Sequence, residues 1–299
     1  MKKPGHIFIP ILFCLFAFCL HARLSAQEIK HYMFTGHTYQ WYTDGSKVDP
    51  RLVELDKSVY NRIWLGGDIC SEAMLKRSTL EYIDSLFRIH EPWNHYALGN
   101  HDTRNGNLEW YREITGRETY CAYYQDGITT INMNTCIVPS DCEHLDAQFR
   151  MIENVCDTIT GSSHLILIMH HAIWDNVPGL PSPSQYSHTE FPYWNANCYY
   201  RENNTFVGAI YPMLVEVKGR GIKVICINGD MGANGKVIDM YSDDGIHFMG
   251  CGLDNSRYTD PVELAAQPKD RILVFEHDVE ARTMTWSFQD LDSLLQIQQ

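Results

Sequence analysis

The sequence predicts an α/β fold in a single large domain, because short apolar runs alternate with amphipathic stretches of helical length. Three of the apolar runs, at residues 63–65, 96–98 and 165–169, are followed by Gly-Gly-Asp, Gly-Asn-His-Asp and His-His. The carboxyl ends of strands carry the chemistry in α/β proteins. These three endings, rich in residues that bind metals or carry protons, therefore predict one site at a sheet edge.

The other elements follow from periodicity. We expect strands at residues 30–34, 119–124, 128–134, 222–227, 271–276 and 284–288, with a hairpin turn at Asp126-Gly127. Apolar spacing predicts helices over residues 71–90, 142–160 and 206–217, and a helix with a turn at 110–119. Ser71 is expected to cap the first of them. Residues 176–204, rich in proline and aromatic residues, are expected to form a long loop, which either binds a ligand or is simply held on the fold.

Residues 1–26 have the pattern of a cleavable signal peptide. Lys2 and Lys3 precede an apolar core at residues 7–20, and Leu24-Ser25-Ala26 precedes the expected cleavage site. That core is shorter than the about 20 residues of a membrane span, although an uncleaved anchor is the alternative. The mature domain is then residues 27–299, which we expect to be periplasmic or secreted, with no later membrane span.

Cysteine content and charge restrict the class of protein further. Of the 10 cysteines, Cys14 and Cys19 lie in the signal peptide, and some of the rest are expected to pair in an oxidising compartment. No Cys-x-x-Cys spacing supports a zinc knuckle, and Cys226, within an apolar run, is expected in the core. A net charge of −13 argues against a nucleic-acid partner. An anionic substrate would need metal ions to reverse the local field.

The site residues resemble a known family. Gly67-Asp68, Gly99-Asn100-His101-Asp102 and His170-His171, in this order, look like the second, third and fourth signature blocks of the calcineurin-like metallophosphoesterases, which include the purple acid phosphatases. The resemblance extends roughly from His31 to Phe288. It implies a four-layer β-sandwich flanked by helices, with divalent metals at the strand ends and a small-molecule phosphate ester as substrate.

The resemblance also implies roles for single residues. It makes metal ligands of five side chains, namely His37, Asp68, Asn100, His170 and Asp230. It gives His101, oriented by Asp102, a catalytic role, and places Thr35, His171 and Asp254 beside the ligands or the substrate. Thr35 stands where the family has an aspartate, and Asp230 and Gly232 stand where its fifth block has two histidines.

The departures affect the two metal positions unequally. The position formed by Asp68, Asn100, His170 and Asp230 is complete and is expected to bind manganese, iron, zinc or magnesium firmly. The other keeps only His37 and Asp68, so its metal is expected to be weak or absent.

Three functions are compatible with this pattern. The first is a metal-dependent hydrolase that attacks phosphate monoesters or diesters with metal-activated water. The second is a catalytically lapsed protein that binds phosphate-bearing or glycan ligands, for which Thr35 and Gly232 speak. The third, a structural or interaction protein at the cell surface, has no specific support. The His101-Asp102 pair favours the enzyme, because a pure binding protein needs no proton donor.

Overall fold

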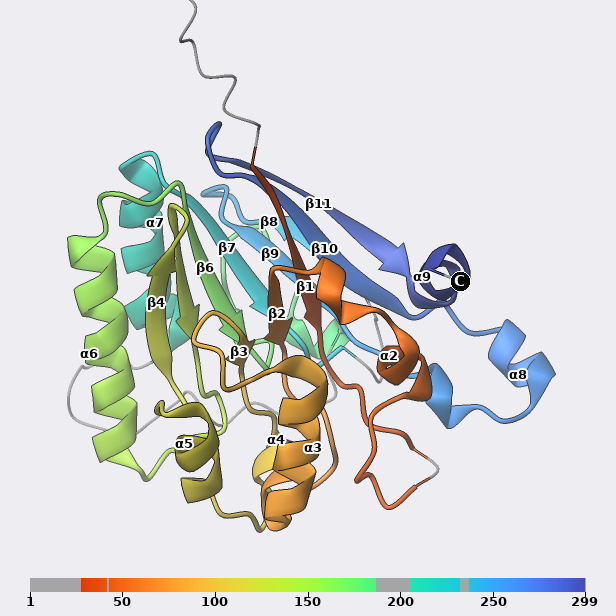
Figure 1. The fold of residues 1–299 in the computed structure, drawn as a ribbon. Coiled ribbons are helices and arrows are strands. Elements are labelled where there is room, and N and C mark those ends of the chain that lie inside the picture. The colour runs from red at the N-terminus through yellow and green to blue at the C-terminus, as the bar shows by residue number, and fades with distance from the viewer. Residues whose placement is uncertain (1–27, 42, 187–204, 232–236, 299) are drawn as a thin grey trace, which may run out of the picture.

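The computed structural model describes residues 28–41, 43–186, 205–231 and 237–298, so the expected signal peptide lies outside the described residues. Two sheets form the centre of the molecule (Figure 1). In the first, the strands follow the order β11 (Thr283–Asp290), β10 (Arg271–Asp278), β1 (Ile29–Thr35), β2 (Arg62–Leu65) and β3 (His95–Tyr96). In the second, the order is β4 (Cys121–Gln125), β5 (Ile128–Asn132), β6 (His164–Met169), β7 (Lys223–Asn228), β9 (His247–Cys251) and β8 (Val237–Tyr241).

Both sheets are mixed, each with a block of parallel strands beside antiparallel ones. β1, β2 and β3 run parallel, as do β5, β6, β7 and β9, whereas β10, β11, β4 and β8 pair antiparallel with their neighbours. The parallel strands therefore deliver their carboxyl ends to the same edge of their sheet. This arrangement positions the residues after β1, β2, β3, β6 and β7 for a shared site.

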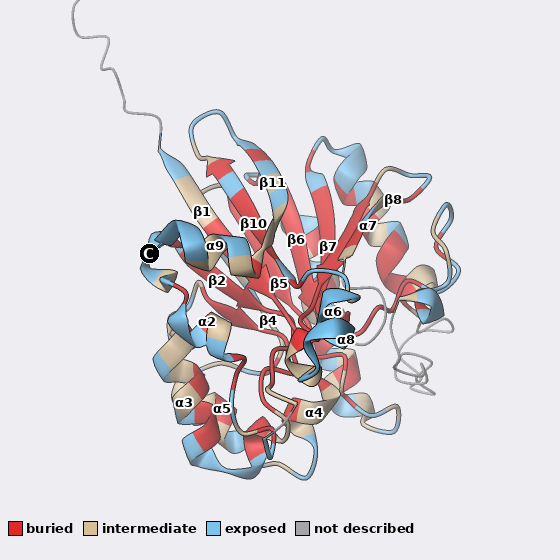
Figure 2. Ribbon diagram, turned by 90° about the vertical axis from the view of Figure 1, so that its right-hand side faces the viewer, coloured by how far each residue is buried: buried red, intermediate tan, exposed pale blue. Residues whose placement is uncertain are grey.

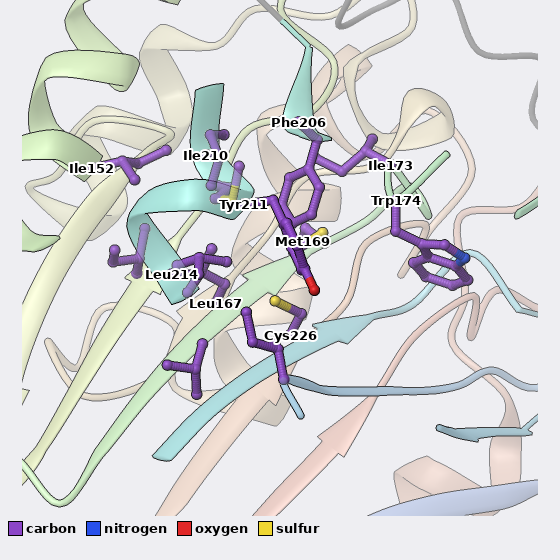
Figure 3. Packing of buried hydrophobic residues seen from close by; sticks show 14 of the residues in the cluster. Ile152, Leu167, Met169, Ile173, Trp174, Phe206, Ile210, Tyr211, Leu214 and Cys226 are labelled. Atoms are coloured by element: carbon purple, nitrogen blue, oxygen red, sulfur yellow. The ribbon is translucent and has the colours of Figure 1, made fainter. Parts of the chain in front are cut away.

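Helices cover the outer faces of both sheets. α3 (Arg77–Phe87), α5 (Glu109–Thr115), α2 (Pro50–Glu54) and α9 (Leu291–Gln298) contribute to the core outside the first sheet. α6 (Cys142–Thr158) and α7 (Tyr211–Gly219) cover the second sheet, and Ile152, Leu214 and Leu167 of β6 belong to the same buried cluster (Figure 3). The predicted α/β sandwich with helices on both outer faces is confirmed.

Burial on both faces explains the continuous apolar runs. Leu165 and Leu167 of β6 face the α6 and α7 helices, while Ile166 and Ile168 join the layer between the two sheets. Figure 2 shows the central strands almost wholly buried and the helices exposed on their outer sides. A parallel strand covered on both faces is apolar at every position, which is why these runs lack alternation.

The structure differs from the sequence-based expectations at several helix starts. Ser71 does not cap the first helix, because α3 begins at Arg77 with Lys76 as its N-cap, after a short 3₁₀ turn at Ala73–Leu75. The third predicted helix starts as a wide π turn, Phe206–Ile210, and becomes α-helical as α7. Pro212 lies at the start of α7. It lacks the N–H that a regular α-helix through this point would require.

Other expectations agree more closely. The Asp126-Gly127 hairpin joins β4 to β5, and both turn residues have positive φ, 55° and 74°, as a tight two-residue turn requires. Cys226 is buried. Cys142 is disulfide-bonded, and six cysteines in the described part are free. The short helix α8 (Pro261–Ala265) and the strand β8 were not predicted. No helix within the described ranges is long and apolar enough to cross a membrane.

Candidate metal centre

The carboxyl edges of the two sheets meet through glycines. A Cβ atom on Gly229, after β7, would lie 2.2 Å from the carbonyl oxygen of Gly66, after β2. A Cβ atom on Gly36, after β1, would lie 2.5 Å from the Cα atom of Gly229. Any side chain here would force the strand ends apart. These glycines therefore allow side chains from different sheets to share one site.

The imidazole of His170 lies at the centre of the cluster. Its Nδ1 is 2.7 Å from the carbonyl oxygen of Gly66, and because a carbonyl only accepts, Nδ1 carries the proton. Nε2 then faces three oxygen atoms, Asn100 Oδ1 at 3.2 Å, Asp68 Oδ2 at 3.5 Å and Asp230 Oδ1 at 3.9 Å. A ring nitrogen surrounded by acceptor oxygens needs positive charge, either as a proton on Nε2 or as a cation among these atoms. A divalent cation, bound by imidazole nitrogen and carboxylate and amide oxygens, supplies it.

Two overlapping groups of side chains have the spacing of metal ligands. In one, the ligand atoms of His37, Asp68 and Asp230 all lie within 4.8 Å of one another; in the other, the same holds for His170, His171 and Asp230. All five residues are buried. The donor set fits a divalent ion, and Asp230, common to both groups, is placed to contact an ion at either position.

The charges in the centre depend on one another. Burial opposes ionisation of Asp68, but the imidazoles of His170, His37 and His101 outweigh it and lower the pKa of that carboxyl group. For His170, burial acts against the charged form, whereas Asp68 and Asp230 raise its pKa. Each group thus favours the charged form of its opposite, the imidazoles that of Asp68 and the carboxylates that of His170.

Two of the expected ligands have strained backbones. Asp68 and His37 adopt φ angles of 54° and 51°, in the left-handed region that side chains other than glycine seldom occupy. The backbone N–H of His37 donates to the carbonyl oxygen of Gly67 at 2.8 Å, which fixes this conformation. Such strain costs on the order of 1 kcal/mol per residue and occurs preferentially at functional sites.

Asp102 holds the Asp68 turn in place, and it does not orient His101 as the sequence led us to expect. Its fully buried carboxylate accepts four hydrogen bonds. The donors are the backbone N–H groups of Asp68 at 2.6 Å, Ile69 at 3.1 Å and Gly99 at 2.8 Å, and the Tyr96 hydroxyl at 2.5 Å. Burial, helped by the charge of Asp68, raises the pKa of Asp102 to about 7. Asp102 is therefore a positioning residue.

His101 lies at the rim of the centre. Its backbone N–H donates to Asp68 Oδ1 at 2.9 Å, and its Nδ1 is 3.4 Å from Ser71 Oγ. Burial lowers the pKa of this half-buried imidazole, while Asp68 raises it. Nε2 is the ring nitrogen left to meet a substrate.

The structure places the other expected residues as follows. The Thr35 hydroxyl is buried and has no hydrogen-bond partner in the described part of the chain, at the position where the phosphoesterases that the sequence resembles have a carboxylate. His171, expected only beside the ligands, belongs to one of the ligand groups, and its Nδ1 is 2.8 Å from Thr135 Oγ1. Asp254 is buried and pairs with Arg257 at 3.2 Å, outside both ligand groups. Gly232 lies outside the described residues.

Sequence reasoning missed three residues near the centre, Tyr39, Trp41 and Arg257. The Tyr39 ring lies between the imidazoles of His37 and His101, with centroid distances of 4.9 Å and 5.2 Å. The spacing His37-x-Tyr39-x-Trp41 directly after a strand is a signal that could have indicated the two aromatic residues. Arg257 offers no such signal.

Comparison with known proteins gives only a loose likeness. No family model and no curated protein matches the chain. Among solved structures, a single mutant of Vps29 from Entamoeba histolytica is similar at 11% identity and a TM-score of 0.35, covering 87% of this chain and 98% of that one. Vps29 from Cryptosporidium parvum is similar at 10% identity and a TM-score of 0.36, covering 87% of this chain and 97% of that one. Vps29 from Chaetomium thermophilum is similar at 9% identity and a TM-score of 0.32, covering 87% of this chain and 94% of that one. A likeness at these values carries no functional information, so the chemistry rests on the side chains of this chain.

Proposed function

We propose that this protein is a metal-dependent phosphoesterase that hydrolyses small phosphate mono- or diesters. The observation that carries the proposal is the surrounding of His170 Nε2 by oxygens of Asn100, Asp68 and Asp230 at 3.2 to 3.9 Å. The motifs that place these residues resemble those of calcineurin-like metallophosphoesterases. A divalent ion there would act as a Lewis acid and lower the pKa of a bound water.

The residues of the chain have separable tasks in this reaction. Asp68 and Asp230 supply negative charge to the cation, and Asn100 and His170 complete its surroundings. Asp102 fixes the turn that carries Asp68. At the rim, His101 donates a hydrogen bond from Nε2 to the phosphoryl group or to the leaving oxygen, where charge develops.

We also propose that the mature protein acts outside the cytoplasm. The pattern of residues 1–26 supports export. The net charge of −13 supports a small ester in preference to nucleic acid, because long-range repulsion would oppose binding of a polyanion.

A second candidate function is binding without turnover. The buried Thr35 hydroxyl favours it, because a neutral hydroxyl in place of a carboxylate weakens one of the two metal positions. A phosphate-bearing or glycan ligand could then bind at the remaining metal without being cleaved.

Hydrolysis assays separate the two candidates. The mature protein would be titrated with manganese, iron, zinc or magnesium and assayed on aryl phosphate mono- and diesters, beside the Asp68→Asn variant. Asp260→Asn is a matched control, because Asp260 is an exposed carboxylate that caps α8. Metal-dependent turnover that Asp68→Asn abolishes and Asp260→Asn retains would support the phosphoesterase. Metal binding without turnover in folded protein would refute it in favour of the binding function.

A further inference from the structure

Tyr39, Trp41 and Arg257 form a continuous wall on one side of the metal centre, which we call the aromatic–arginine wall. The Tyr39 and Trp41 rings lie 4.7 Å apart, and the Trp41 ring is 5.4 Å from that of His37. The guanidinium carbon of Arg257 lies 3.9 Å from the centroid of Trp41, a stacking distance. Arg257 Nε pairs with Asp254 at 3.2 Å, which fixes the guanidinium over the indole.

Two hydrogen-bond donors of the wall are buried and have no partner among the residues that the structure describes. They are the Tyr39 hydroxyl and the Trp41 indole Nε1. A buried polar group left unpaired costs roughly 1–3 kcal/mol, and native proteins rarely keep one without a reason. Thr35 Oγ1 is a third such atom on the same seven-residue stretch, 35–41. The concentration of these atoms on the stretch that carries His37, a candidate metal ligand, indicates a polar ligand as the missing partner.

Ordinary core packing does not explain the unpaired Tyr39 hydroxyl. Three other tyrosines with buried rings place their hydroxyls on partners, Tyr32 on His277 at 2.9 Å, Tyr96 on Asp102 at 2.5 Å and Tyr211 on Asp244 at 2.7 Å. The indole of Trp64 is also unpaired, but it lies in the apolar layer between the sheets. Trp41, by contrast, adjoins a guanidinium and a candidate metal ligand.

The charges around Tyr39 indicate that the ligand is an anion. The Tyr39 ring contacts Trp41, and the guanidinium of Arg257, which pairs with Asp254, stacks on that indole. The Tyr39 hydroxyl and the Trp41 N–H are thus donors close to a guanidinium, which suits an acceptor that carries negative charge. A divalent cation held by Asp68 and Asp230 would add positive charge near these donors.

We propose that the aromatic–arginine wall recognises the terminal phosphoryl oxygens of a phosphate monoester, with Tyr39 Oη and Trp41 Nε1 as hydrogen-bond donors and Arg257 as the balancing charge. This inference rests on the proposed function and names its substrate class. A monoester dianion offers three terminal oxygens and a second negative charge. A diester offers two terminal oxygens and one charge, so it would leave part of the wall unused.

Calorimetry with inorganic phosphate tests this inference without relying on turnover. The full mature protein is first titrated with manganese alone and then, loaded with manganese, with phosphate. Tyr39→Phe removes only a hydroxyl, and Trp41→Phe removes the N–H while keeping an aromatic ring. Tyr124→Phe is the control, because Tyr124 is 59% exposed.

The variants should bind manganese as the wild type does and should bind phosphate about 10-fold or more weakly, the loss expected for one hydrogen bond to a charged group. Tyr124→Phe should bind phosphate normally. If the wild type turns over esters, Tyr39→Phe should lower kcat/KM for an aryl monoester more than for a diester. Manganese and phosphate binding at wild-type strength in both wall variants would overturn the inference and leave the phosphoesterase proposal standing. Failure of the folded wild type to bind manganese would overturn both.

Discussion

Removal of the Asp270 carboxylate should destabilise the fold and disturb the aromatic–arginine wall together. Asp270 is buried and accepts hydrogen bonds from Arg51 Nη2 at 2.5 Å and from the backbone N–H groups of Asp254 and Asn255 at 2.9 Å and 3.0 Å. These two N–H groups begin the turn that carries Arg257. Asp270 therefore connects a half-buried ion pair to the recognition surface.

The magnitude follows from what each substitution leaves behind. Asp270→Ala leaves two backbone N–H groups without an acceptor and removes one partner of the half-buried Arg51 guanidinium. We expect the free energy of unfolding to fall by about 3–5 kcal/mol. In Asp270→Asn, the amide oxygen can accept from Arg51 and Asn255, so only the Asp254 N–H loses its acceptor. The free energy of unfolding should then fall by about 1–2 kcal/mol. Asp49, 2.7 Å from Arg51 Nη2, stays in place in both variants and limits the loss.

Equilibrium unfolding in urea, followed by tryptophan fluorescence, measures these differences. Asp292→Ala is the matched control, because Asp292 also pairs with Arg51, at 3.1 Å, but its side chain is 43% exposed. An exposed pair contributes about 0–1 kcal/mol. If Asp270→Ala and Asp292→Ala lowered the free energy of unfolding to the same extent, burial would not be what makes the Asp270 contacts strong, and the reasoning would be refuted.

Three further predictions concern pH and metal. Burial, with Arg117 and Arg62 nearby, lowers the pKa of His95 in the folded protein to about 3. In the unfolded chain the same imidazole binds a proton near pH 6.5. The free energy of unfolding should therefore fall as the pH drops below 6.5, by about 2 kcal/mol at pH 5. Urea titrations at pH 7 and pH 5 should show a smaller fall for His95→Gln, and an equal fall would exclude His95 as the cause. Thr35→Asp should tighten manganese binding beside His37 about 10-fold in calorimetry, whereas Thr35→Ser should not. Equal manganese affinities of Thr35→Asp and the wild type would show that residue 35 does not reach the ion. Removal of the divalent ion by a chelator should lower the thermal midpoint of the wild type but not that of Asp68→Asn. The reason is that an ion present at 100 times its Kd stabilises the folded protein by about 2.7 kcal/mol. Equal shifts of the midpoint in both proteins would place the ion elsewhere.

The sequence was most informative where a strand is buried on both faces. The continuous apolar run at residues 165–169 gave β6 nearly to the residue, and the polar residues after three such strands do come together in space. The pattern of apolar residues shows which strands are buried, and parallel pairing of these strands places their carboxyl ends at the same edge of the sheet. For this reason the neighbourhood of Asp68, Asn100 and His170 could be predicted without a structure.

The directions of side chains within that neighbourhood could not be predicted. Asp102 neighbours His101 in sequence, yet its carboxylate turns to the backbone of Asp68, 34 residues away. The choice depends on how the turns after β2 and β3 pack together, which no local pattern encodes. Tyr39 and Trp41 were missed for a related reason, since their importance lies in the partners they lack, and that is visible only once all other groups are placed.

The distribution of free cysteines has a practical consequence. Cys70 belongs to the core outside the first sheet, Cys251 to the layer between the sheets, and Cys156 and Cys226 to the core beneath α6 and α7. Burial raises the pKa of all four thiols, to about 12 for Cys156 and Cys251, so that a folded layer protects them from alkylation. Each apolar layer thus contains its own chemical reporter. Pulsed alkylation read by mass spectrometry would show in which order the layers open, without introducing a single foreign residue.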